Sequence, residues 1–537
     1  MSSKEPAMIV AAQPEAAEAG ARVLMRGGNA VDAAMAAALV QGVVDPQMCG
    51  IAGFGSCQIY DPGSGRHACI DFHGRTPLAA TPEMWADRLE GETRDGFGFV
   101  LRGHVNDLGH QSVATPGALM AYAEAVREFG SWDWADICAP AIAQAEAGFA
   151  VRPHVYFWWT HGAEHGRVAV AERLAHSLTG REIYFRGDGQ PKRIGERVHN
   201  PDLARTLMRI AREGAEDFYT GEIAERIEAD MAAHGGLLTR ADLAAYRTQR
   251  TEPLRGTYRG HDIATNHPPG GGIMLIEMLN ILECFDLAAM GHNTADYIRI
   301  VSEAMKAATA DKDAHVGDPA FVAVPSHLTL KAHARGIAER IADGQRIRVP
   351  RYGQPETPHT THVAVVDRAG LCVSMTHSLG MPSGVIPDGL GFMMNGCMGV
   401  FDPRPGRAGS IAPGKARFSS VCPTIVFRQG RPRVVLGAPG GTQIAMGVLQ
   451  AILNVIDWEM DMERAVSAPR FSATSDAVDI MNRIPDYAVE QLRAEGIEVL
   501  RSALTFGIGA VHGIRIGADG ALDGGADPSH DGVALRV

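Results

Sequence analysis

Residues 361–379 read Thr-His-Val-Ala-Val-Val-Asp-Arg-Ala-Gly-Leu-Cys-Val-Ser-Met-Thr-His-Ser-Leu. Two runs rich in β-branched residues flank the turn sequence Asp367-Arg-Ala-Gly370, and this pattern predicts a β-hairpin. Residues 423–427 and 432–436 flank a Gln-Gly pair in the same way and predict a second hairpin. We therefore expect sheet to dominate from about residue 357 onward.

The chain before this point is predicted to be mainly helical. Apolar periodicity and glycine punctuation predict helices over residues 14–25, 30–44, 116–129, 200–213 and 294–310. After the second hairpin, Gly437-Ala-Pro-Gly-Gly441 leads into a helix over 442–457, and a strand pair around 511–516 and 533–537 is expected to close the chain. Since no repeat or linker divides the sequence, the simplest architecture is one α+β core with strands stacked between helical layers.

The composition indicates which partners to expect. Of 537 residues, 50 are Lys or Arg and 62 are Asp or Glu, which gives a net charge of −12. An acidic balance disfavours nucleic acid and anionic membranes as partners. The N-terminus lacks the cationic start and apolar run of a secretory signal, and no 18-residue apolar stretch occurs. We expect a cytoplasmic protein that acts on a small molecule.

Thr360, directly before the first hairpin, is the first candidate for chemistry. Its spacing alone favours an ordinary strand threonine with high β propensity. The functional alternative is that its hydroxyl attacks the carbonyl of His359 and cuts the chain. Thr360 would then carry a free α-amino group, with a pKa of about 7.7 to 8.0, beside its own hydroxyl.

Two other features were weighed as sites. Gly440 and Gly441 precede a helix and could present backbone N–H groups to an oxyanion or a phosphate, although a simple tight turn explains them equally well. Their spacing fits neither of the common nucleotide-binding glycine motifs. The 21 histidines and eight cysteines form no H-E-x-x-H or C-x-x-C motif, so no metal or other cofactor is expected.

Short blocks spread over nearly the whole chain resemble the gamma-glutamyltransferase family of N-terminal nucleophile hydrolases. They occur in the family's order: Gly27–Ala34, Pro268–Ile273, Glu303–Lys306, Gly317–Pro319, Thr360–His362, Ser419–Ser420, Pro439–Gly441 and Gly525–Pro528. The resemblance is to the cytoplasmic members that are similar to oxamate amidohydrolases and acylases.

The resemblance implies a four-layer αββα sandwich made as one precursor. Cleavage would give a large, mainly helical chain, residues 1–359, and a small chain, residues 360–537, that starts at the nucleophile. The two would form one interlocked domain, an αβ heterodimer that could pair further.

The resemblance also implies roles for single residues. Thr360 matches the nucleophile, and Ser378 stands where the family has a threonine that hydrogen-bonds it. Gly440 and Gly441 match the oxyanion hole. Ser419 and Ser420 match the pair that holds the substrate's α-carboxylate.

The sequence departs from the family pattern in the substrate pocket. Gly380 stands where the family has an Asn, and Val400 stands where the family has an Asp that binds the substrate's α-ammonium. His73 stands in place of the arginine that meets the α-carboxylate, and we predict that Arg75 takes over that contact. The stretch from Phe401 to Ser420 is short, which predicts a truncated lid.

Three functions follow. The first is an amidohydrolase that cleaves the amide of a small carboxylate-bearing substrate, such as an oxamate or glutaryl amide, through an acyl-threonine. The second is a true gamma-glutamyltransferase or glutathione hydrolase, and the third is an inactive binding relative. Turnover of a γ-glutamyl anilide compared with simple acyl amides separates them.

Overall fold

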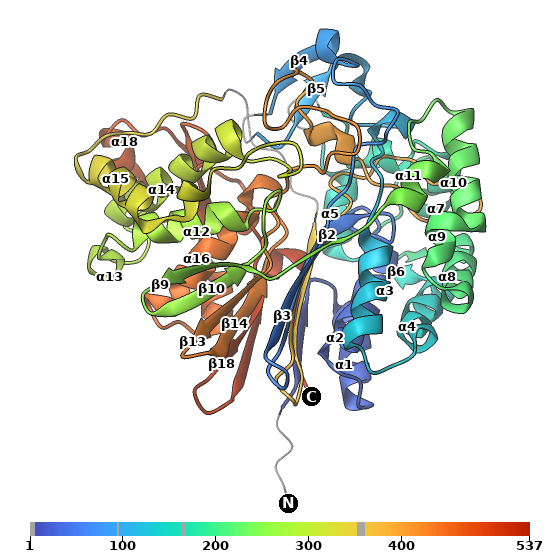
Figure 1. Ribbon diagram of the computed structural model, residues 1–537, viewed down its shortest axis with the longest axis horizontal. Helices are drawn as coiled ribbons and strands as arrows, with labels where there is room; N and C mark the ends of the chain where they lie inside the picture. Colours follow the sequence, from blue (N-terminus) through green and yellow to red (C-terminus); the bar gives the residue numbers. More distant parts are fainter. Residues whose placement is uncertain (1–5, 94–95, 163–166, 352–359) are drawn as a thin grey trace, which may run out of the picture.

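The computed structural model describes residues 6–93, 96–162, 167–351 and 360–537. Two β-sheets face each other at the centre of the molecule, and helices cover the outer side of each (Figure 1). This arrangement confirms the expected α+β sandwich with αββα layers. None of the helices within the described ranges is both long and apolar enough to span a membrane.

The first sheet has seven antiparallel strands, and the second has six. In spatial order the first sheet contains β20 (Val533–Arg536), β1 (Met8–Ala11), β11 (Thr361–Val366), β12 (Cys372–Ser378), β2 (Phe54–Asp61), β3 (Arg66–Phe72) and β8 (Gln249–Thr251). The second contains β19 (Leu522–Ala526), β18 (His512–Ile516), β14 (Arg431–Gly437), β13 (Thr424–Arg428), β10 (His261–Thr265) and β9 (Leu254–Tyr258). Apolar side chains from both sheets, such as Val10, Ala364 and Val435, form the core between them.

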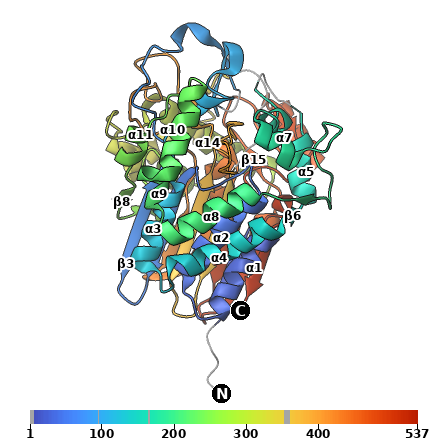
Figure 2. The ribbon, with the colours of Figure 1, turned by 90° about the vertical axis from the view of Figure 1, so that its right-hand side faces the viewer.

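The helices divide between the two outer faces in chain order. The first sheet is covered by α1 (Pro14–Met25), α2 (Ala30–Val44), α3 (Ala118–Phe129), α4 (Trp134–Ala147), α5 (Pro153–Thr160), α6 (Val170–Leu174), α7 (Leu178–Tyr184), α8 (Pro201–Glu213), α9 (Glu216–Thr220), α10 (Glu222–Ala233) and α11 (Arg240–Ala245), as Figure 2 shows. The second is covered by α12 (Gly272–Leu282), α13 (Leu287–Met290), α14 (Ala295–His315), α15 (Lys331–Ala342), α16 (Ile444–Ile456), α17 (Met462–Ser467) and α18 (Asp486–Ala494).

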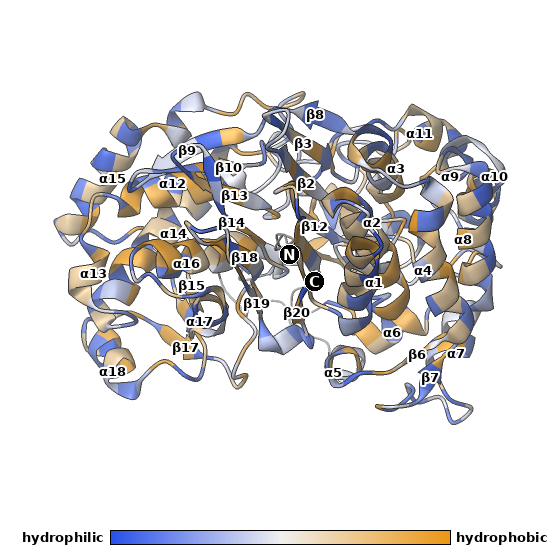
Figure 3. Cartoon of the chain, turned by 90° about the horizontal axis from the view of Figure 1, so that it is seen from below, coloured by the Kyte–Doolittle hydropathy of each residue, from blue (hydrophilic) through white to orange (hydrophobic). Residues whose placement is uncertain are grey.

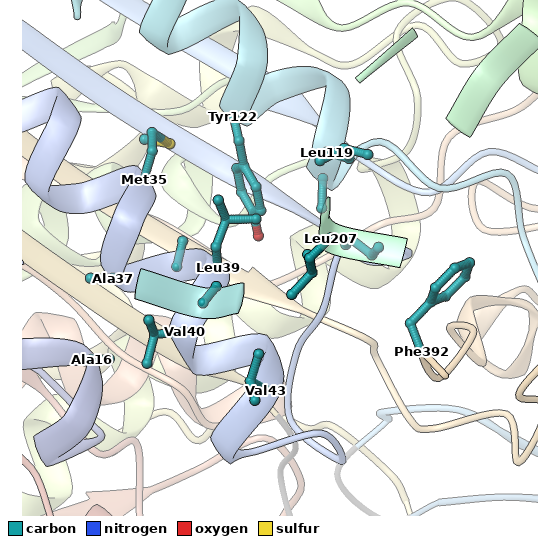
Figure 4. Close-up of a cluster of buried hydrophobic side chains, with 14 of the residues drawn as sticks. Ala16, Met35, Ala37, Leu39, Val40, Val43, Leu119, Tyr122, Leu207 and Phe392 are labelled. Atoms are coloured by element: carbon teal, nitrogen blue, oxygen red, sulfur yellow. The ribbon is translucent and has the colours of Figure 1, made fainter. Parts of the chain in front are cut away.

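Helix α2 explains how the first helical layer approaches its sheet so closely. Its many alanines are small, and nearly all of its residues are buried. A β-carbon on Gly20 of α1 would lie 2.9 Å from the Ala33 carbonyl oxygen, so the two helices touch along their backbones. Larger side chains, among them Leu39 and Tyr122, fill the space toward α3 and α8 (Figure 4).

Hydropathy follows the same layered plan. Seen from below, the hydrophobic colouring is strong on α12 and α16, which lie against the second sheet (Figure 3). Most residues of both helices belong to the hydrophobic core of this half of the molecule. The sandwich is therefore held by one apolar layer between the sheets and one beneath each helical layer.

Both predicted hairpins are confirmed, as β11–β12 and β13–β14. The predicted closing strand pair is wrong, because β18 pairs with β14 and β19, whereas β20 pairs with β1 in the other sheet. Strand β19 lies in the glycine- and aspartate-rich stretch between β18 and β20. Strands β8, β9 and β10 interrupt the segment expected to be helical, and they are only three to five residues long.

Several strand ends meet at one edge of the sandwich. Thr361 at the start of β11 pairs with His377 near the end of β12, and Ser378 pairs with Phe54 at the start of β2. In the facing sheet, β14 ends and β13 begins at the same edge, since Thr424 pairs with Leu436. The loops that leave these ends carry most of the predicted site residues.

Candidate active site

Thr360 lies immediately before β11 and is only 3% exposed. Its hydroxyl donates a hydrogen bond to Ser378 Oγ at 3.1 Å, and that oxygen also accepts the Gly380 N–H at 2.8 Å. Ser378 therefore fixes the direction of the Thr360 hydroxyl, as predicted for a nucleophile and its partner. His359 lies outside the described residues, so the bond predicted to be cut is not described.

Thr360 and Ser378 open onto a cavity of about 270 Å³. Predicted site residues that also line it are Ser419, Ser420 and Gly441, together with the two departures Gly380 and Val400. The cavity is large enough for a small acyl group and part of its leaving amine. The structure thus brings the candidate nucleophile together with residues from loops far apart in the sequence.

The glycine turn places the start of a helix against this cavity. Gly440 has a φ angle of +148° and Gly441 a φ angle of +54°. Only glycine readily adopts the first of these values. A β-carbon on Gly440 would also lie 2.9 Å from Gly509 Cα. Gly441 and the following Thr442 line the cavity, whereas Gly440 is not among its lining residues. Backbone N–H groups at such a helix start suit a developing oxyanion.

The two serines are held by the predicted glycine loop. The Ser419 N–H donates to the Pro269 carbonyl oxygen at 2.9 Å, and Ser419 Oγ accepts from the Val421 N–H at 3.3 Å. A β-carbon on Gly271 would lie 2.4 Å from the Ser420 carbonyl oxygen. Residue 271 must therefore be glycine if the segment that carries the two serines is to reach the cavity wall.

His73 and Arg75 are not brought to the cavity. His73 is buried 3.7 Å from Asp71, and burial, helped by the charges of Arg417 and Arg75, lowers its pKa to about 3. The ring is therefore neutral. Arg75 donates to the Gly414 carbonyl oxygen at 3.2 Å, away from Thr360. Neither residue lines the cavity, so the structure does not support the predicted contact of Arg75 with substrate.

The sequence analysis missed the guanidinium that does line the cavity, that of Arg417. Arg417 is 3% exposed, lies 4.4 Å above the Phe54 ring, and donates to the Phe418 carbonyl oxygen at 3.0 Å. Its Nη1 lies 3.6 Å from Cys397 Sγ. A β-carbon on Gly380 would lie 2.5 Å from the same Nη1, so the guanidinium lies directly beside that glycine.

Arg417 differs from the other cations around the cavity in its partners. Arg404 makes two 2.7 Å hydrogen bonds to Asp402, and Arg351 and Lys312 both form ion pairs with Asp313. No carboxylate within the described ranges forms an ion pair with Arg417. Burial lowers the pKa of its guanidinium, which is the direction expected for a desolvated cation without a counter-ion. The absence of a side chain at residue 380 was the one sequence signal that a neighbour fills this space.

Comparisons with known proteins agree with this geometry. The family model of gamma-glutamyltranspeptidase matches residues 16–537. The chain belongs to the gamma-glutamyltranspeptidase family. Among relatives of this family, "Acylase ACY 1 proenzyme" of Pseudomonas sp. (strain V22) is 38% identical over 99% of this chain and 93% of its own length. "Glutathione hydrolase proenzyme" of Escherichia coli (strain K12) is 32% identical over 97% of this chain and 90% of its own.

A solved structure gives the same result for the fold. The crystal structure of cephalosporin acylase from Bacillus halodurans has a TM-score of 0.88 and 28% identity, covering 99% of this chain and 96% of that one. The gamma-glutamyltranspeptidase resemblance seen in the sequence is thereby confirmed. This chain is accordingly an enzyme of the amidohydrolase and gamma-glutamyltransferase-like type.

Proposed function

We propose that this enzyme hydrolyses the amide bond of a small acyl group that bears a carboxylate, through an acyl-threonine intermediate on Thr360. The observation that carries the proposal is the cavity itself. It joins the Thr360 hydroxyl, held by Ser378, to the buried and carboxylate-free cation of Arg417. A nucleophile and an anion receptor in one cavity select an acyl group with a negative charge near its scissile amide.

The enzyme would first process itself. The Thr360 hydroxyl attacks the His359 carbonyl, the peptide nitrogen leaves as the α-amine of Thr360, and water hydrolyses the resulting ester. Large and small chains of residues 1–359 and 360–537 result. Both relatives named above are called proenzymes, which supports this step. Strands β1 and β2 pair with β11 and β12, so the chains would stay together as an αβ unit.

Catalysis would then use the new terminus. The α-amine takes the proton of the Thr360 hydroxyl as its oxygen attacks the substrate carbonyl, and the same proton passes to the leaving amine. The N–H groups of Gly440 and Gly441 would stabilise the oxyanion, a contribution of roughly 3 kcal/mol for one donor. Water next attacks the acyl-threonine ester and releases the carboxylic acid. Ser378 keeps the hydroxyl aimed during both halves of the reaction.

The substrate's acyl group would lack an α-ammonium. Gly380 and Val400 line the cavity and offer no side-chain acceptor for one, and Arg417 would repel it. The carboxylate would meet Arg417, with Ser419 and Ser420 as hydroxyl donors. The name of the acylase relative agrees with action on an acyl group. The second candidate function, action on γ-glutamyl compounds, is supported by the name of the Escherichia coli relative.

Chromogenic anilides test this choice directly. Glutaryl-p-nitroanilide and γ-glutamyl-p-nitroanilide have the same carbon chain with the carboxylate at the same position, and they differ only in the α-ammonium. We expect kcat/KM for the glutaryl compound to be at least about tenfold higher. A γ-glutamyl preference, or strong acceleration of that substrate by acceptor dipeptides, would establish the second function instead.

A further inference from the structure

Three side chains of types that can bind a metal meet between three helices of the second helical layer. Glu277 comes from α12, Asp311 from α14 and His333 from α15, which lie side by side in Figure 1. His333 Nε2 is 3.1 Å from Asp311 Oδ2 and 3.5 Å from Glu277 Oε1. All three potential ligand atoms lie within 4.8 Å of one another.

Glu277 is out of place unless something neutralises it. It lies in the middle of the apolar helix Gly-Ile-Met-Leu-Ile-Glu-Met-Leu-Asn-Ile-Leu and is 1% exposed. Its Oε1 makes no hydrogen bond, because His333 Nε2 donates to Asp311. A buried carboxylate beside a second one requires a proton or a cation.

The spacing of the three atoms fits a tetrahedral cation. With zinc–ligand bonds of about 2.0 to 2.2 Å, neighbouring ligand atoms of a tetrahedral site lie roughly 3.3 to 3.6 Å apart. The His333–Glu277 separation of 3.5 Å lies in this range, and the His333–Asp311 separation of 3.1 Å lies slightly below it. The two carboxylate oxygens lie within 4.8 Å of each other. Asp311 and His333 are about one quarter exposed, at 27% and 25%, so a cation can enter and a water molecule can take the fourth position.

We propose that Glu277, Asp311 and His333 form a binding site for a divalent transition metal of the zinc class. One imidazole and two carboxylates are a donor set that such ions accept. Binding neutralises the buried Glu277 carboxylate and joins the three helices at one point. Asp311 directly precedes Lys312 and Asp313, which line the active-site cavity, so the metal also fixes the segment that forms part of the cavity wall.

A second cluster in the same molecule provides a matched control. His110, Asp230 and His234 also bring three ligand atoms within 4.8 Å. In this cluster Asp230 accepts a hydrogen bond from His110 at 3.0 Å, and His234 is exposed. Asp230 is not a buried carboxylate without a hydrogen bond, as Glu277 is. By the reasoning above this cluster needs no cation. The second cluster has two histidines and one carboxylate, whereas the first has one histidine and two carboxylates, and only the first contains a buried glutamate.

The test uses tag-free enzyme stripped with EDTA and titrated with Zn²⁺ in a calorimeter, with Co²⁺ as a spectroscopic probe. We expect one equivalent of Zn²⁺ per chain, a Tm rise of about 2 °C at a hundredfold excess over Kd, and the visible absorption of tetrahedral Co²⁺. Glu277→Gln and His333→Ala should weaken binding at least tenfold, and His234→Ala should leave it unchanged.

Two results would overturn the proposal. One is a wild-type enzyme that takes up neither metal at micromolar concentration, which would mean that Glu277 is neutralised by a proton alone. The other is a folded Glu277→Gln variant, verified by circular dichroism, that binds Zn²⁺ as tightly as wild type. A readout by binding and Tm keeps this test independent of the substrate assigned above.

Discussion

Replacing Arg417 by Gln removes the cation from the active-site cavity while keeping a side chain of similar length. A charge-assisted hydrogen bond to a carboxylate is worth about 1.5 to 3 kcal/mol, so kcat/KM for glutaryl-p-nitroanilide should fall roughly 10- to 150-fold. Butyryl-p-nitroanilide, which has the same chain without the carboxylate, should change less than about threefold. The ratio of the two values, measured by release of nitroaniline, therefore reports the charge contact alone.

Stability separates this role from a structural one. The buried Arg417 has no carboxylate partner within the described ranges, so its removal leaves no orphaned anion. The contacts that are lost are those with Phe54, the Phe418 carbonyl and Cys397 Sγ. We expect Tm within a few degrees of wild type. Arg75→Gln is the matched control, since Arg75 lies outside the cavity and should keep the wild-type ratio. An unchanged glutaryl-to-butyryl ratio in Arg417→Gln, or a lowered ratio in Arg75→Gln, would refute the reasoning.

Further predictions concern processing, packing and pH. Wild-type protein should run as two chains on a denaturing gel, and the smaller chain should begin with Thr-Thr-His-Val. The Thr360→Ala variant should run as one chain. If it is still cut, an external protease cleaves the protein instead. Asparagine is tolerated at the φ of +74° that Gly380 adopts, and in a Gly380→Asn variant its β-carbon should displace the Arg417 guanidinium. Turnover of the glutaryl substrate should then fall about tenfold. A crystal structure of the variant with Arg417 unmoved would contradict this. Burial lowers the pKa values of His377 and His512 to about 3, below the unfolded value of about 6.5, so their contribution to stability is complete above pH 6.5 and is lost as the pH falls toward 3. Each should remove about 2 kcal/mol by pH 5, which denaturant titrations at pH 7.5 and pH 5 measure, and equal free energies of unfolding would reject the assignment.

Local patterns predicted those parts of the fold that depend on local forces. Helices α1 and α2 have the predicted bounds because apolar periodicity, a capping asparagine and glycine breaks all lie within a few residues. The hairpin β11–β12 was predictable for the same reason. A strand at residues 533–537 was predicted, but its pairing was not predictable, because its partner β1 lies at the other end of the chain.

The site shows the same division. Thr360, Ser378 and Gly441 were found because short stretches of sequence around them resemble the family, and the structure places them on one cavity. Arg417 was missed because its relation to Gly380 exists only in space, across 37 positions of sequence. The possible metal ligands were missed likewise, since each comes from a different helix and no spacing motif connects them.

The pairing of the first sheet has a consequence for how the protein could be made. Strand β1 lies between β11 and β20, and β12 lies beside β2, so strands from before residue 360 pair with strands from after it at three places in the sheet. A gene divided at codon 360 would encode two fragments, each with unsatisfied strand edges along its length. Such edges associate with one another, so either fragment expressed alone should aggregate. Joint expression of both fragments should restore the sandwich and deliver Thr360, after removal of the initiator methionine, as a terminus that never required cleavage.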